Sequence, residues 1–96
     1  MNSQYCYQYT VVWYEQNWKV VAGMPYRKFF STKLDAKLFA RNRRANCPEV
    51  IVKPIVVRSI VDVSTFKKGA KVEPVSLAIV ARSCGFVSSG ETIIRY

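Results

Sequence analysis

The side chains with the clearest chemical potential in this sequence are bases spaced along one predicted helix. Four of them stand at i, i+4, i+8 and i+11, which places them on one face over about three turns: Lys33, Lys37, Arg41 and Arg44. Residues 27–48 contain seven bases and one acid, which is most of the chain's formal net charge of +9. Like charges at this spacing repel one another, so the stripe favours an anionic partner, with a solvated helix face as the alternative.

Two further basic pairs and one aromatic row are candidate binding residues. Arg27-Lys28 and Lys67-Lys68 are solvated by default, and they add to the stripe only where the fold brings them beside it. The aromatic side chains alternate along one predicted strand and share a face: Tyr5, Tyr7, Tyr9 and Trp13. Such a row either packs in the core or forms a platform on which nucleic-acid bases stack.

Catalytic and metal-binding chemistry is not indicated. The chain has no histidine, which excludes Ser–His and Cys–His arrangements, and its six acids form no obvious pair. It has no phosphate-binding or dinucleotide-binding glycine motif. Three cysteines, Cys6, Cys47 and Cys84, are widely spaced without a CxxC motif, which is typical of free thiols in a reducing compartment. We therefore expect a protein that is not an enzyme and has no metal site and no cofactor.

The N-terminal half reads as a β-hairpin followed by a helix. Tyr5–Tyr14 alternates as a strand does, Trp18–Ala22 resumes as a second strand, and Tyr26–Phe30 is a short extension or a third strand. Thr32 and Asp35 approximate a capping box for a helix that ends near Ala45. The apolar residues of this helix predict a core-facing side, flanked by Phe39 and made of Leu34, Leu38 and Ala45. Arg43 points away from the basic stripe and is expected to serve solubility or a neighbouring subunit.

The C-terminal half is richer in β-structure. Glu49–Val57 is a Val/Ile-rich strand in which Pro54 requires a sheet edge or a bulge, and Ile55–Val63 either continues it or crosses over. After a basic loop at Thr65–Ala70, the segment Val75–Cys84 fits a helix or a strand, with the helix favoured by Pro and Gly at its two ends. Thr92–Tyr96 is a closing strand. Together these elements predict a single α+β domain over residues 1–96: an N-terminal β-hairpin packed on one basic amphipathic helix, then further strands and a second short helix.

The function that these features favour is nucleic-acid binding, to DNA or RNA, through phosphate contacts of the basic stripe. The alternative is a phage or mobile-element accessory protein that inhibits or adapts a host protein complex through an acidic protein surface. No apolar run is long enough to span a bilayer and the start lacks the features of a secretory signal, so a cytoplasmic protein is expected. The Val/Ile-rich strand favours pairing of edges or faces in a homodimer, with a monomer protected by Pro54 as the alternative.

Overall fold

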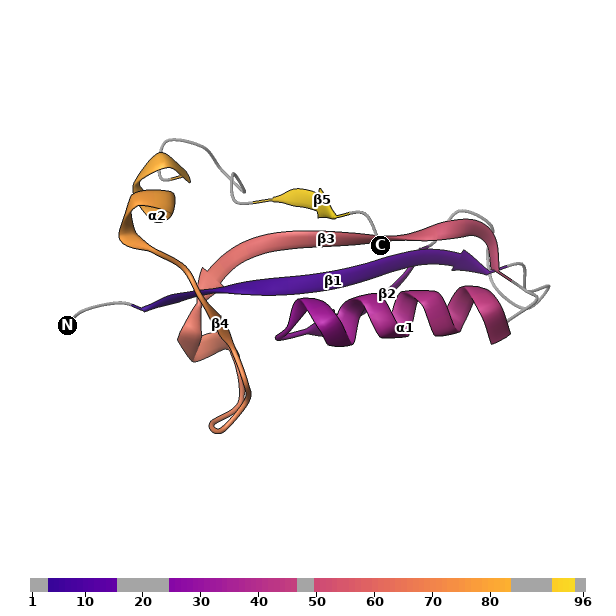
Figure 1. Ribbon diagram of the computed structural model, residues 1–96, viewed down its shortest axis with the longest axis horizontal. Coiled ribbons are helices and arrows are strands. Elements are labelled where there is room, and N and C mark those ends of the chain that lie inside the picture. The colour runs from indigo at the N-terminus through magenta and orange to yellow at the C-terminus, as the bar shows by residue number, and fades with distance from the viewer. Residues whose placement is uncertain (1–3, 16–24, 47–49, 84–90, 95–96) are drawn as a thin grey trace.

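The computed structural model describes residues 4–15, 25–46, 50–83 and 91–94. They form one antiparallel sheet with a long helix on one face, which confirms the predicted α+β class (Figure 1). The molecule measures 48 × 28 × 23 Å. The strands are β1 (Tyr5–Glu15), β2 (Tyr26–Phe30), β3 (Val50–Asp62), β4 (Glu73–Pro74) and β5 (Thr92–Ile94). The helices are α1 (Lys33–Asn46), a 3₁₀ turn η1 (Val63–Thr65) and α2 (Leu77–Ser83).

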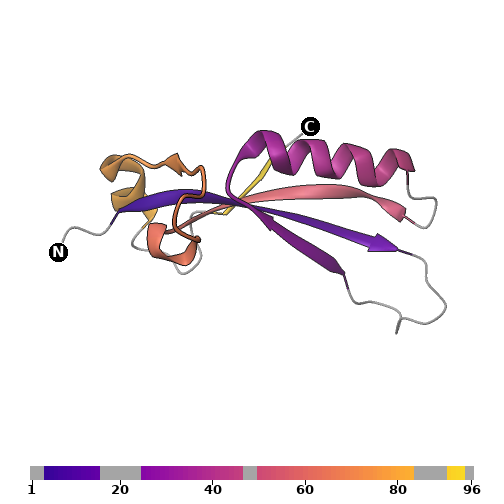
Figure 2. The same cartoon turned by 90° about the horizontal axis from the view of Figure 1, so that it is seen from below.

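The sheet is built around the long antiparallel pair β1 and β3. Its strand order is β2-β1-β3-β5, and the short β4 pairs with the N-terminal part of β1. Figure 2 shows α1 running alongside β3, with β2 on the far side of β1. The predicted strand over Trp18–Ala22 lies outside the described residues, and the described partner of β1 on this side is β2.

The structures of β3 and α2 decide between alternatives that the sequence left open. The strand β3 is continuous from Val50 to Asp62, and its register with β1 shifts between Val12 and Tyr14, opposite Pro54. Pro54 therefore lies at a bulge, one of the two predicted positions for a proline in this strand. Leu77–Ser83 is helical, as favoured, and the Ser76 hydroxyl accepts a hydrogen bond from the Ile79 N–H at 3.4 Å. Pro74 lies in β4 and does not begin the helix.

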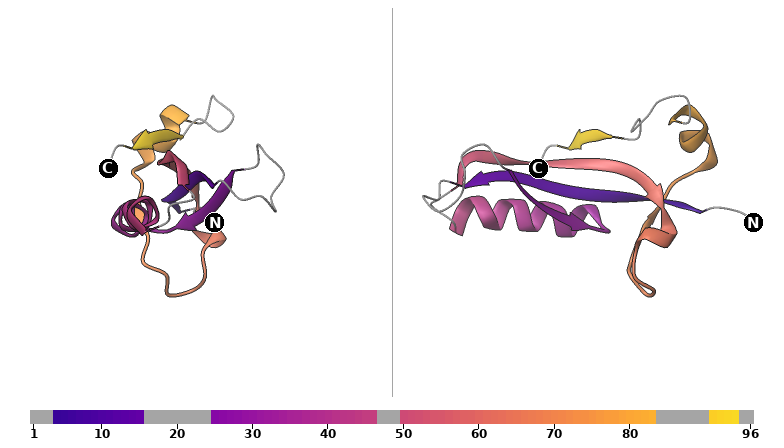
Figure 3. Two further views of the ribbon diagram at one scale, coloured as in Figure 1. Left: turned by 90° about the vertical axis from the view of Figure 1, so that its right-hand side faces the viewer. Right: turned by 180° about the vertical axis from the view of Figure 1, so that it is seen from behind.

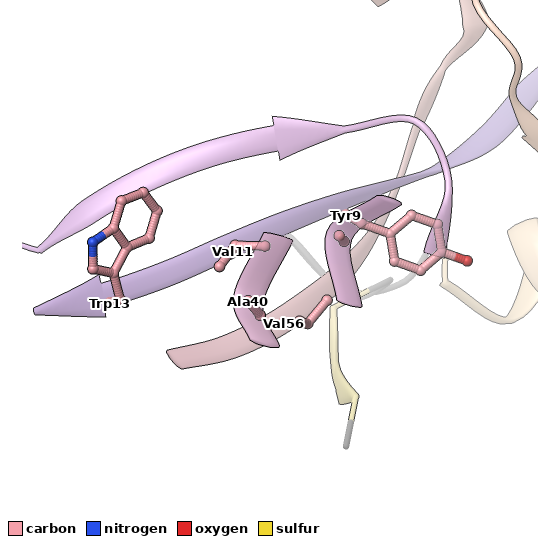
Figure 4. Close-up of a cluster of buried hydrophobic side chains, with 6 residues drawn as sticks. Tyr9, Val11, Trp13, Ala40 and Val56 are labelled. Atoms are coloured by element: carbon pink, nitrogen blue, oxygen red, sulfur yellow. The ribbon is translucent and has the colours of Figure 1, made fainter. Parts of the chain in front are cut away.

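The hydrophobic core lies between α1 and the odd-numbered residues of β1. Tyr9, Val11 and Trp13 of β1 pack with Val56 of β3 against Ala40 of α1 (Figure 4). Figure 4 shows Trp13 at one end of this cluster and Tyr9 at the other. Two residues of the aromatic row, Tyr9 and Trp13, thus belong to the core.

The prediction for the core-facing side of α1 is wrong. Ala36 and Ala40 are fully buried, whereas Leu34 is 65% exposed and Leu38 is 52% exposed. The strands already provide the bulky apolar groups, so the helix contributes small side chains, which allow its backbone to lie close to the sheet. The outer side of α1 therefore carries an apolar ridge, which consists of Leu34, Leu38 and Ala45.

This helix orientation gives a prediction for stability. Leu38→Ala should change the free energy of unfolding by less than about 1 kcal/mol, because the side chain is half exposed and alanine is the best helix former. Urea denaturation followed by circular dichroism measures the change. A loss above about 2 kcal/mol would mean that Leu38 packs in the core, as the sequence pattern predicted.

None of the described helices is long and apolar enough to cross a membrane.

Candidate functional site

The basic stripe lies on the flank of α1 that is nearest β3. Lys33, Arg41 and Arg44 are exposed and Lys37 is half-buried. The opposite flank carries Phe39, whose ring lies 5.3 Å from that of Phe30 in β2. We call the four bases on the β3 side, Lys33, Lys37, Arg41 and Arg44, the basic flank.

A depression of about 450 Å³ extends from the basic flank toward β3. Among the described residues it is lined by Arg41, Arg44, Ala45 and Lys53. Three cationic side chains from two different elements thus surround one concave surface, and the described lining includes no acid. Asp35 is the acid of α1 and precedes Phe39 by four residues, so the two lie on the same side of the helix. This side is the flank opposite the basic flank.

Sequence reasoning missed Lys53, because nothing local marks a strand residue as a neighbour of the preceding helix. The one available signal is the Lys53-Pro54 dipeptide. The proline requires a bulge here, and bulges change the direction of the side chains beside them.

The two residues of the Arg27-Lys28 pair lie on opposite faces of the sheet. Lys28 lies on the α1 side, where its Nζ is 4.9 Å from the centre of the Phe39 ring and 5.7 Å from that of Phe30. Arg27 lies on the other face and lines a separate depression there. The pair therefore does not extend the basic flank as a unit.

Lys67 and Lys68 are exposed in a turn closed by a hydrogen bond from the Ala70 N–H to the Lys67 carbonyl at 3.1 Å. Gly69 has φ of 89°, a conformation that favours glycine at this position of a turn. Figure 1 shows the segment between η1 and β4 extending on the same side of the sheet as α1, beyond the N-terminal end of the helix. These lysines are not among the described residues that line the depression beside Lys53.

The predicted aromatic platform is taken up by the core. Trp13 is 4% exposed and Tyr9 1% exposed, so neither ring is accessible for stacking with a base in this conformation. Tyr5 and Tyr7 are half-buried, and the Arg58 guanidinium lies 4.4 Å from the Tyr7 ring centre. The packing interpretation of the row is therefore the one that the structure favours.

Arg43 also differs from its predicted role. It is half-buried, and its guanidinium lies 5.3 Å from the centre of the Trp13 ring. A cation over an indole face is attracted by the ring quadrupole, so Arg43 helps to fasten the C-terminal half of α1 to β1.

The N-terminal end of α1 is held by a carboxylate from β4. Glu73 accepts a hydrogen bond from the Tyr9 hydroxyl and another from the Lys33 N–H, the latter at 2.9 Å. Burial and the adjacent Glu73 raise the pKa of Tyr9 above its ordinary value, so its hydroxyl stays protonated and can donate. The Thr32 hydroxyl oxygen also accepts from the Asp35 N–H at 3.4 Å, which corresponds to the predicted cap. Together these contacts fix the start of the basic flank.

Within the described part of the chain, no three His, Cys, Asp or Glu side chains come together as metal ligands would. Cys6 is fully buried and unpaired, and burial raises the pKa of its thiol. Cys47 and Cys84 lie outside the described residues.

Comparisons with protein-family models, with curated proteins and with solved structures found no match for this chain.

Proposed function

We propose that this protein binds nucleic acid through the phosphate backbone, with the basic flank of α1 and Lys53 of β3 as the contact surface. The observation that carries the proposal is the depression in which Arg41, Arg44 and Lys53 converge. Arginine presents a planar fork of donors that matches a phosphate, and lysine adds a point charge. A phosphate in the depression is attracted by all three of these cations.

The shape of the surface suits a polyanion better than a single small anion. Lys33 and Lys37 continue the positive charge along α1 toward its N-terminus. Lys33 and Arg44 are separated by about 16 Å along the helix axis at 1.5 Å per residue. A nucleic-acid strand advances by about 3.4 Å per nucleotide, so this row can follow several successive phosphates. The contact is to the backbone, and we expect it to be insensitive to sequence.

Binding of a labelled 20-mer, as duplex and as single strand, tests the proposal by fluorescence anisotropy over a range of salt concentrations. The informative variant is R41A/R44A/K53A. Its matched control is K67A/K68A/K71A, which removes the same number of positive charges from exposed positions outside the described lining of the depression.

We expect wild type to bind at low salt and to weaken steeply toward physiological salt, because released counterions drive the association. The R41A/R44A/K53A variant should lose at least about tenfold in affinity at low salt, and its salt slope should fall by about 3. The control should stay within about threefold of wild type. Absence of binding by wild type at low salt would contradict the proposal, and so would an equal loss in both variants, which would mean that only net charge matters.

A second candidate function, contact with an acidic protein, is favoured by the ridge of Leu34 and Leu38. These exposed side chains lie beside the basic flank, and a phosphate backbone offers them no apolar surface. The L34A/L38A variant keeps all charges and separates the two functions. Nucleic-acid binding should be unchanged in this variant, whereas a stoichiometric protein partner recovered from a nuclease-treated lysate by wild type should be lost.

A further inference from the structure

The sheet face opposite α1 carries exposed apolar side chains. We call it the open face: it consists of Gln8, Thr10 and Val12 of β1 and their cross-strand partners in β2, β3 and β5. Phe29 of β2 is 60% exposed, Ile55 of β3 is 41% exposed and Ile93 of β5 is 65% exposed. The left view of Figure 3, along the strands, shows α1 on the other side of the sheet. An antiparallel sheet can face water on one side, but that side is then usually polar.

A shallow depression of about 290 Å³ crosses the open face. Among the described residues it is lined by three apolar side chains, three uncharged polar side chains, one acid and one base: Val12, Phe29, Val57, Gln8, Thr10, Ser59, Glu91 and Arg27. Arg27 lies in β2 and Glu91 directly precedes β5, so the two charges lie toward opposite edges of the sheet. Both side chains are exposed, and no ion pair joins either of them to another described residue.

We propose that the open face is a self-association surface, and that a second copy of this chain covers it. In a two-fold dimer with stacked sheets, the axis lies in the plane between them. Suppose that this axis crosses the line from Arg27 to Glu91 at its midpoint and at a right angle. The two-fold rotation then places Arg27 of one copy over the Glu91 position of the other. Arg27 of each copy then meets the partner's Glu91, and both ion pairs form at once. The exposed apolar side chains between the two pairs are removed from water.

The charge pattern distinguishes this face from another exposed apolar surface, the ridge on α1. Two copies that met through Leu34 and Leu38 would bring two basic flanks together, and like charges across an interface are strongly unfavourable. The open face has one charge of each sign at its described depression, so it is complementary to itself. The predicted pairing through β3 edges is not available over the central part of this strand, because β3 lies between β1 and β5 there.

A charge-reversal cycle tests the proposal without nucleic acid and independently of the proposed function. Nuclease-treated wild type, R27E, E91R and R27E/E91R are compared by sedimentation equilibrium in reducing buffer, with circular dichroism to verify the fold. We expect wild type to dimerise at micromolar concentration. Each single variant replaces two ion pairs with two like-charge contacts, so its dimer should be about 10- to 100-fold weaker. The double variant restores both pairs in reversed sense and should recover the dimer.

Phe29→Asp should give a folded monomer, because it replaces an exposed apolar side chain of the interface with a charge in each copy. A wild type that stays monomeric at all concentrations would overturn the proposal. It would also be overturned by a dimer that R27E, E91R and F29D leave unchanged. A Phe29→Asp variant that keeps its oligomeric state but loses single-strand binding would assign the open face to nucleic-acid bases instead.

Discussion

Replacing Trp13 with alanine is expected to lower the free energy of unfolding by about 3–5 kcal/mol, which is enough to leave much of a domain this small unfolded. The indole connects three elements. It stacks on Tyr26 of β2 with 5.6 Å between ring centres, and it lies 5.2 Å from the ring of Phe39 in α1. The Arg43 guanidinium lies 5.3 Å from the centre of the same ring. Its removal leaves a cavity between sheet and helix that small neighbours such as Ala40 cannot fill.

Urea denaturation followed by far-UV circular dichroism measures this loss, since the substitution also removes a fluorophore. Tyr14→Ala is the matched control, because it truncates the next aromatic residue of the same strand, which is 39% exposed. We expect the control to lose less than about 1.5 kcal/mol. A Trp13→Ala protein as stable as the control would show that the α1–sheet contact does not depend on the indole.

The longer strands and the main helix were predictable because their signals are local. Alternation along Tyr5–Tyr14 predicts a strand with its aromatic residues on one face, and the Thr32–Asp35 pair predicts the start of α1. The segment after Val75 was ambiguous, because its alternating pattern and its terminal proline and glycine indicate different elements. A serine cap at Ser76 and the short β4 before it resolve that ambiguity.

The rotation of α1 was not predictable from the helix alone. Sequence patterns assign the largest apolar side chains to the core, which selected Leu34 and Leu38. The choice depends on what the sheet presents to the helix. Three large side chains of β1, Tyr9, Val11 and Trp13, already fill the space, and only alanine-sized groups fit against them.

The candidate site was predicted only in part, because its geometry also depends on how α1 packs on the sheet. The row of bases on α1 follows from helical spacing, but the partners that shape the site are distant in sequence. Lys53 joins Arg41 and Arg44 through the packing of β3 beside α1. Arg43 and Lys28 look like further members of the basic surface, yet their charged groups lie over aromatic rings of the core.

The two proposals have a joint consequence for assembly. A dimer that stacks the open faces places α1 of each copy on the outside, because α1 covers the opposite side of each sheet. Its two basic flanks would then face away from each other. Such a dimer would connect two nucleic-acid segments.

The second large effect is expected at Glu73, which joins β4 to β1 and to the first turn of α1. Glu73→Ala removes the acceptor of the Tyr9 hydroxyl and of the Lys33 N–H, and the Tyr9 side chain is buried. Leaving a buried donor without a partner costs about 1–3 kcal/mol. We therefore expect Glu73→Ala to lower the free energy of unfolding by this amount, with Glu73→Gln, which retains an acceptor oxygen, losing less.

A double-mutant cycle with Tyr9→Phe separates this hydrogen bond from a general effect of removing an acid. Phenylalanine keeps the ring in the core and has no donor, so nothing is left unpaired when Glu73 is also replaced. In the Tyr9→Phe background, Glu73→Ala should therefore cost less than in wild type, by about 1 kcal/mol or more. Urea denaturation of the four proteins gives the coupling energy. Costs that add to within about 0.5 kcal/mol would contradict this role, because two side chains in direct contact are expected to be coupled, whereas independent sites are additive.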